Sequence, residues 1–235
     1  MKPYTLSTIL LAASFAVAKE KISLQWAICD SSPQDVLPKL GLDPTTPPYK
    51  ENPITYYDEL PPVYISEGIM LRAKTNKGQP LSTVKVRFPE LKSNVPEFVE
   101  CGWDQYGDQR TYTCEKRCPQ DPESPEIWCD EQLQFVGQYH DLDWSTLAAY
   151  GPFPDAKWKV HIGGYKAKFD DVVASDSLHL MEIEAQVPLA KANKAYKRIT
   201  RHLKKRGVVL CDPQDGKTLR LFHAMGYTGN GRSEL

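Results

Sequence analysis

Two strand-like segments carry basic side chains at alternate positions. Arg72 and Lys74 lie in the first segment, and Lys85 and Arg87 lie in the second, with one residue between the members of each pair. Because alternate residues of a strand project to the same side, each segment is expected to have one cationic and one apolar face. Guanidinium forks and ammonium groups bind phosphate oxygens. The pattern therefore indicates anion binding, and the alternative is a sheet whose polar face lies in water.

The same alternation recurs elsewhere in the chain. If the two cationic segments pair around the turn-forming residues 76–78, four cations lie side by side, which costs stability unless water or an anion neutralises them. Glu182 and Glu184 share one face of a later strand, and Lys159 shares a face with His161. The sequence contains no P-loop, no Gly-x-Ser-x-Gly motif and no histidine spacing typical of a metal site.

The six cysteines indicate disulfide bonds, because an even number of cysteines in an exported chain usually pairs. Residues 98–116 are predicted to form a hairpin with Gly107 and Asp108 in its turn. This register sets Cys101 opposite Cys114, at a distance suited to a cross-strand disulfide.

The other cysteines are assigned by elimination. Cys118 would then pair with Cys129, and Cys29 with Cys211. The alternative is that the four central cysteines bind zinc, although their spacing differs from ribbon and finger patterns.

The N-terminus has the features of a signal peptide. Lys2 precedes a short apolar run, and Ala16-Val17-Ala18 fits a cleavage site before Lys19. We therefore expect a secreted protein with a signal peptide at 1–18 and a single domain at 19–235. No segment has the roughly 18 apolar residues that a membrane span needs. The formal net charge of −1 predicts no general attraction to nucleic acid.

Many short strand-like segments and one long helix favour an α+β fold. Helices are predicted at 142–149, capped by Asp143, and at 190–206, with a single helical turn at 36–40. The predicted strands, besides the hairpin, are 22–29, 54–57, 69–74, 83–88, 158–162, 178–185 and 218–222.

Several of these segments follow one another in the order of a known family. Tyr56-Tyr57-Asp58 precedes Gly68-Ile69-Met70-Leu71-Arg72-Ala73-Lys74, and Thr83-Val84-Lys85-Val86-Arg87 follows. This order resembles the CYTH, or triphosphate tunnel, superfamily, whose motifs are aromatic-Tyr/Phe-Asp, Gly-x-x-Leu-Arg-x-Arg and Thr-x-Lys-x-Arg. Residues 147–159, and the Glu-x-Glu strand, helix and basic segment of 178–220, are similar to later parts of the family.

The resemblance implies a CYTH-like antiparallel β-barrel, or tunnel, with a long C-terminal helix and the disulfide hairpin as an insertion. In that family, basic residues point into the tunnel and hold a polyphosphate chain, and carboxylates hold a divalent metal. The anion ligands implied here are Arg72, Lys74, Lys85, Arg87, Lys159 and Arg220. Glu182 and Glu184 are implied as the catalytic residues and as ligands of Mg²⁺ or Mn²⁺. The expected partner is a phosphorylated or polyanionic small molecule.

The first strand departs from the family. Ser23, Gln25 and Ala27 occupy the positions where catalytic members have Glu-x-Glu-x-Lys. Three ionisable groups are therefore missing, and two hypotheses remain open. The first is an anion-binding barrel with weak metal-dependent phosphohydrolase activity, and the second is a non-catalytic secreted interaction protein that uses the barrel as a scaffold.

Overall fold

The computed structural model describes residues 20–227, except residues 77, 122, 176 and 177. The predicted signal peptide at 1–18 lies outside the described residues. The elements, in chain order, are β1 (Lys21–Ile28), α1 (Pro33–Lys39), β2 (Lys50–Glu51), β3 (Ile54–Asp58), η1 (Tyr64–Glu67), β4 (Ile69–Asn76), β5 (Gln79–Phe88), β6 (Glu100–Tyr106), β7 (Gln109–Pro119), α2 (Asp130–Gly137), β8 (Ala148–Phe153), β9 (Asp155–Ile162), β10 (Tyr165–Ser175), β11 (Leu178–Pro188), η2 (Leu189–Lys191), α3 (Ala192–Lys205) and α4 (Lys217–Ala224).

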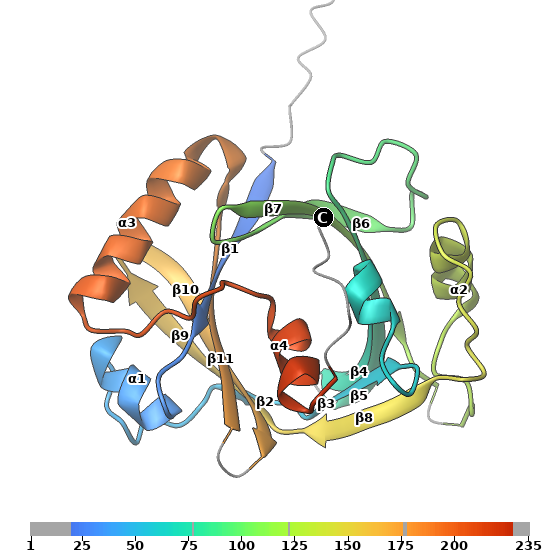
Figure 1. The fold of residues 1–235 in the computed structure, drawn as a ribbon, viewed down its shortest axis with the longest axis horizontal. Helices are drawn as coiled ribbons and strands as arrows, with labels where there is room; N and C mark the ends of the chain where they lie inside the picture. The colour runs from blue at the N-terminus through green and yellow to red at the C-terminus, as the bar shows by residue number, and fades with distance from the viewer. Residues whose placement is uncertain (1–19, 77, 122, 176–177, 228–235) are drawn as a thin grey trace, which may run out of the picture.

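All the strands of the described chain belong to one strongly curved sheet (Figure 1). Their order is β2-β9-β10-β11-β1-β6-β7-β5-β4-β3-β8. Neighbouring strands are antiparallel, except that β1 and β6 run parallel in the described part. The predicted antiparallel sheet is therefore confirmed in its main features. The two edges approach because β8 leads through Pro154 into β9, but no described pairing joins β8 to β2.

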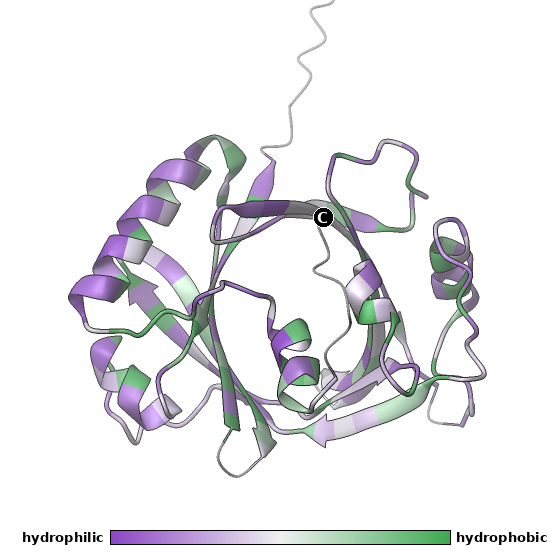
Figure 2. Cartoon of the chain, viewed as in Figure 1, coloured by the Kyte–Doolittle hydropathy of each residue, from purple (hydrophilic) through white to green (hydrophobic). Residues whose placement is uncertain are grey.

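Most of the apolar side chains of the strands lie on the outer side of the curved sheet, in two core clusters. Helices α1 and α3 cover β1 and β9–β11, where Trp26 and Phe169 are fully buried. Helix α2 covers β4, β5 and β7 through Phe135. Figure 2 shows α3 as largely hydrophilic, since only the residues against the sheet are apolar. The polar faces of the strands are consequently left on the inner side.

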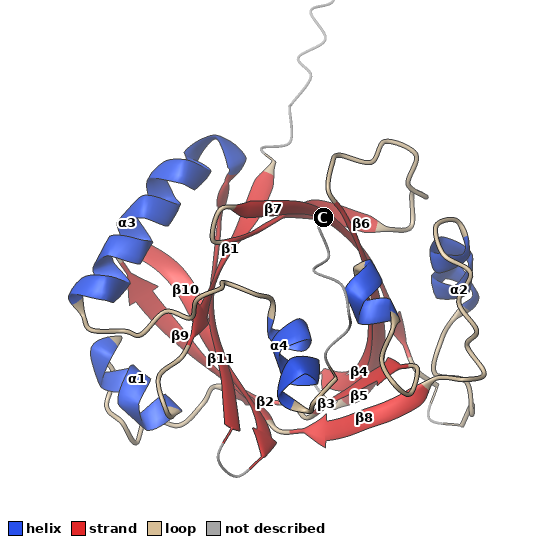
Figure 3. Cartoon of the chain, viewed as in Figure 1, coloured by secondary structure: helices blue, strands red, loops and turns tan. Residues whose placement is uncertain are grey.

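Helix α4 differs from the other helices in its position. Figure 3 shows α1, α2 and α3 outside the curved sheet, whereas α4 projects across its opening. Leu221 and Phe222 of α4 are buried against β3 and β8 residues such as Tyr56 and Tyr150. The predicted strand at 218–222 is wrong, because Thr218, Leu221 and Phe222 are buried at helical rather than alternate spacing.

A second prediction also fails. Residues 142–149 do not form a helix, because Asp143 caps a turn by accepting a hydrogen bond from the Ser145 N–H at 3.0 Å. The chain then enters β8, whose Gly151 has a φ of 113° and approaches the Ile54 carbonyl so closely that a Cβ would lie 2.9 Å from it. Strand β10 and helix α2 were not predicted. The long helix predicted at 190–206 is confirmed as α3.

The three expected disulfides are all present. Cys101 pairs with Cys114 across the β6–β7 hairpin, whose turn is Gly107-Asp108 as predicted. The other bonds are Cys118–Cys129 and Cys29–Cys211. Because all four central cysteines are oxidised, no thiolates remain for the alternative zinc site. Within the described residues, no helix combines the length and apolar character needed to cross a membrane.

Candidate functional site

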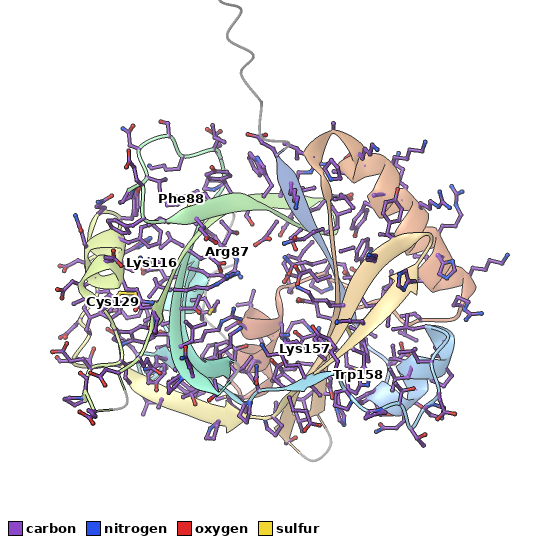
Figure 4. All side chains as sticks on the ribbon, turned by 180° about the vertical axis from the view of Figure 1, so that it is seen from behind. Arg87, Phe88, Lys116, Cys129, Lys157 and Trp158 are labelled. Carbon is purple, nitrogen blue, oxygen red and sulfur yellow. A yellow bond between two sulfur atoms is a disulfide. The ribbon has the colours of Figure 1, made fainter. Side chains whose placement is uncertain are left out.

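The inner side of the curved sheet encloses a cavity of about 750 Å³. Figure 4 shows the alternation directly: Arg87 and Lys157 point inward, while their neighbours Phe88 and Trp158 point outward. Among the described residues, ten lysines and arginines line the cavity against six carboxylates. The cavity is thus cationic although the whole chain is nearly neutral. The lining includes Arg72, Lys74, Lys85, Arg87, Glu182 and Glu184 of the predicted site.

The cationic segments pair in the way that the sequence predicted. Strands β4 and β5 are antiparallel, with Arg72 opposite Thr83 and Met70 opposite Lys85. Since partners in a ladder face the same side, Arg72, Lys74, Lys85 and Arg87 all project into the cavity.

These four cations differ in whether a carboxylate neutralises their positive charge. Lys85 forms an ion pair with Glu115, with 3.0 Å between Nζ and Oε2. In the described part of the chain, Arg72, Lys74 and Arg87 have no carboxylate partner, and the Arg72 Nε atom is buried without a hydrogen bond. A buried donor without an acceptor is costly, and an anion would satisfy it.

The pKa of Lys74 reflects this concentration of positive charge. The neighbouring Arg72 guanidinium, together with burial, lowers the pKa of Lys74 to about 7. Lys157 and Lys50 also lower the Lys74 pKa, and Asp155 opposes them. The cavity therefore has more positive charge at this end than its own carboxylates neutralise.

This shift predicts a pH dependence of stability. Between pH 7 and pH 10, Lys74 keeps its proton in the unfolded chain but loses it in the folded protein, so folding becomes more favourable as pH rises. We expect the free energy of unfolding of the wild type, relative to Lys74→Met, to rise by up to about 1.4 kcal/mol per pH unit. Urea denaturation across this range measures the difference. A Lys74→Arg control, which stays charged, should show no such rise, and a flat difference for the wild type would contradict the prediction.

A buried charge network lies next to this end. Lys157 contacts Asp155 and Asp170, and Lys217 Nζ is 2.6 Å from Asp170 Oδ1. Burial alone would raise the pKa of Asp170, but Lys217 and Lys157 outweigh it and hold that pKa below its usual range. Burial and the Asp170 charge raise the pKa of Asp155 to about 6. Asp170 thus neutralises two lysines from separate elements, β9 and α4.

Glu182 and Glu184 lie on β11, on the opposite side of the network from β4. The Tyr106 hydroxyl donates to Glu182 Oε2 at 2.8 Å, and Ser23 Oγ donates to Glu184 Oε1 at 3.0 Å. Lys168 Nζ is 3.7 Å from Glu184 Oε2. Burial raises the pKa of Glu182, so its negative charge is incompletely compensated.

The two glutamates fit a divalent cation in donor type and charge. Their carboxylate oxygens are the hard donors that Mg²⁺ and Mn²⁺ take, and a cation would offset the burial that raises the Glu182 pKa. Beside them, Ser23 and Gln25 of β1 line the cavity. The one cluster of three metal-capable groups in the described residues, Cys118, Cys129 and Glu131, contains a disulfide.

Two of the predicted ligands do not line the cavity. Lys159 is exposed, on the same face as Lys157 but beyond the lining, and its Nζ lies 4.8 Å from the centre of the Tyr49 ring. Arg220 lies on α4 and donates to the carbonyl oxygens of Met181 and Ile28, each at 3.2 Å. Its guanidinium holds α4 against the ends of β11 and β1.

Sequence reasoning missed several lining residues. Lys157 lies two residues before Lys159, so strand alternation places both on the same face, and the sequence did contain a signal for Lys157. Asp170 and Lys217 gave no usable signal, because strand β10 was not predicted and α4 was predicted as a strand. Tyr106 lies in the predicted hairpin, but its contact with Glu182 depends on the parallel pairing of β1 and β6.

Comparisons with known proteins agree with this architecture. The fold is that of the CYTH-like triphosphate tunnel proteins. A Hippeastrum candidate adenylyl cyclase, described as having a dominant triphosphatase activity, matches with a TM-score of 0.51 and 14% identity over 92% of this chain and 99% of that one. A candidate adenylate cyclase from Bacillus halodurans matches with a TM-score of 0.58 and 12% identity, covering 86% and 97% of the two chains. No family model and no curated protein matches the sequence.

Proposed function

We propose that the cavity binds a small polyanion with several phosphate groups, of which tripolyphosphate is the simplest representative. The observation that carries this proposal is the set of Arg72, Lys74 and Arg87, which all project into the cavity without a carboxylate partner among the described residues. Arginine forks would take phosphate oxygens in pairs, and Lys74 would regain its proton beside the bound anion. The described triphosphatase activity of the Hippeastrum protein with this fold is consistent with such a ligand.

A weak metal-dependent phosphohydrolase activity is a second proposal at the same site. Glu182 and Glu184 would hold Mg²⁺ or Mn²⁺, which when bound polarises phosphoryl oxygens toward attack by water. Ser23 orients Glu184 through its hydrogen bond, and Tyr106 orients Glu182. Because Ser23 and Gln25 stand where a further carboxylate pair was expected, we propose binding as the main function and turnover as slow.

We further propose that the protein is a secreted single domain in which the sheet closes into a complete tunnel. The disulfides that connect β6 to β7, Cys118 to Cys129 and Cys29 to Cys211 support folding in an oxidising compartment. The one-residue connection of β8 to β9 supports closure of the tunnel, since the Val173 N–H of β10 donates to the carbonyl of the connecting Pro154 at 3.0 Å.

Thermal unfolding with tripolyphosphate tests the binding proposal. At a free ligand concentration about 100 times Kd, binding should stabilise the protein by about 2.7 kcal/mol and raise Tm by roughly 5–10 °C. Sulfate at equal ionic strength is the control, because excluded salts stabilise folded proteins without a site. Absence of a ligand-specific shift, with and without Mg²⁺ or Mn²⁺, would favour the alternative of a non-catalytic scaffold. Phosphate release that Glu184→Ala abolishes would establish an enzyme.

A further inference from the structure

The β9–β10 hairpin carries the cationic face of the cavity out to the surface. In its register, Lys159 lies opposite Lys168 and His161 lies opposite Lys166. All four side chains are exposed, and Lys168 still lines the cavity. We call Lys159, His161, Lys166 and Lys168 the basic ladder.

The basic ladder is an unfavourable arrangement without a partner of opposite charge. Basic side chains directly opposite each other on adjacent strands repel. Among the described residues, one carboxylate forms an ion pair with the ladder: Glu184 Oε2 lies 3.7 Å from Lys168 Nζ. For Lys159, His161 and Lys166, no ion pair with a described carboxylate is formed.

One end of the basic ladder adjoins the cavity. The other end, at the tip of the hairpin, adjoins a further cation, Arg198. Lys159 Nζ lies over the ring of Tyr49, which lines the cavity, at 4.8 Å from its centre. At the tip of the hairpin, Arg198 of α3 packs so closely that a Cβ on Gly164 would lie 3.3 Å from Arg198 Nη2. A strand rises about 3.4 Å per residue, so the ladder extends the row from Lys157 to His161 by about 14 Å.

We propose that the basic ladder is a second anion subsite, which holds the part of a linear phosphoanhydride chain that extends out of the cavity. This inference rests on the proposed function, since the cavity would hold the other part of the same chain. The only ring on the face of the ladder is the small imidazole of His161; none of its four positions is Phe, Tyr or Trp, and the Tyr49 ring is covered by Lys159. Single-stranded nucleic acids depend on such rings for base stacking. The geometry therefore favours an unbranched polyphosphate over a nucleic acid.

The experiment compares two ligands on matched variants. Binding of tripolyphosphate and of a long linear polyphosphate is measured by calorimetry for the wild type and for the Lys159→Gln/Lys166→Gln double variant. We expect the double variant to bind the long chain about tenfold more weakly, with a salt dependence reduced by about one unit of slope per lysine, and to bind tripolyphosphate as the wild type does. The control is Lys194→Gln/Lys197→Gln, which removes two exposed lysines from α3.

Three outcomes would overturn the inference. The first is an equal loss for both ligands, and the second is no loss for the long chain. The third is tighter binding of single-stranded DNA than of polyphosphate at the ladder, lost in the same double variant, which would make the ladder a nucleic-acid site. If the wild type does not bind tripolyphosphate, the proposed function fails. In that case the ladder proposal is tested separately, by whether the Lys159→Gln/Lys166→Gln variant binds the long polyphosphate more weakly than the wild type does.

Discussion

Replacement of Asp170 by alanine is expected to lower the free energy of unfolding by about 3 kcal/mol. The substitution leaves Lys157 and Lys217 without the carboxylate that both contact. The Asp170 side chain is 14% exposed toward the cavity, so water reduces the cost to the lower end of the range for a broken buried pair. The corresponding fall in Tm, measured by calorimetry, is roughly 6–12 °C.

A second variant separates charge from packing. Adding Lys217→Met to Asp170→Ala removes the cation whose ion pair is lost, since Lys157 still contacts Asp155, so the double variant should recover part of the lost stability. Glu90→Ala, at an exposed carboxylate, is the control and should change stability by less than about 0.5 kcal/mol. If Lys217→Met made the Asp170 variant still less stable, packing of α4 rather than charge would explain the effect.

Removal of either unpaired arginine should weaken tripolyphosphate binding about ten- to hundredfold. Arg72→Met and Arg87→Met keep most of each aliphatic stem but lose the charged hydrogen bonds to phosphate, which contribute about 1.5–3 kcal/mol each. Titration calorimetry with tripolyphosphate measures the loss. Arg201→Met, at an exposed position on the outer helix α3, is the matched control and should bind like the wild type.

The ligand-free proteins provide an independent check. Arg72 is the largest cause of the lowered Lys74 pKa, so Arg72→Met should relieve repulsion and leave the ligand-free protein no less stable than the wild type at neutral pH. A variant that binds weakly and is also much less stable would point to a structural role for Arg72. Unchanged affinity in both arginine variants would remove the main support for the proposed binding site in the cavity.

Local patterns in the sequence were sufficient to predict the parts of the fold that depend on near neighbours. The alternation around Arg72 and Arg87 identified β4, β5 and the face they present, because strand periodicity is a property of adjacent residues. The Gly107-Asp108 turn fixed the register of the β6–β7 hairpin, and the Cys101–Cys114 disulfide followed from that register. The family resemblance then supplied the arrangement of the whole sheet.

The parts that could not be predicted depend on contacts between distant segments. Lys217 and Arg220 lie in a short segment whose helical form is set by burial of Leu221 and Phe222 against β3 and β8. The face of Lys159 was predictable, but its position beyond the end of the cavity was not, because alternation does not say where along a strand a cavity ends. The parallel pairing of β1 with β6 likewise has no local signal.

The location of the two larger apolar cores outside the curved sheet has a consequence for how such proteins diverge. Residues that hold the fold, such as Trp26 and Phe135, pack under the outer helices, whereas the residues that line the cavity are on the opposite side of the same strands. Inward positions can therefore change charge from one lineage to another while every second residue stays fixed by packing. Selection acting on chemistry and selection acting on foldability would fall on alternate positions of each strand, as in Arg87 and Phe88.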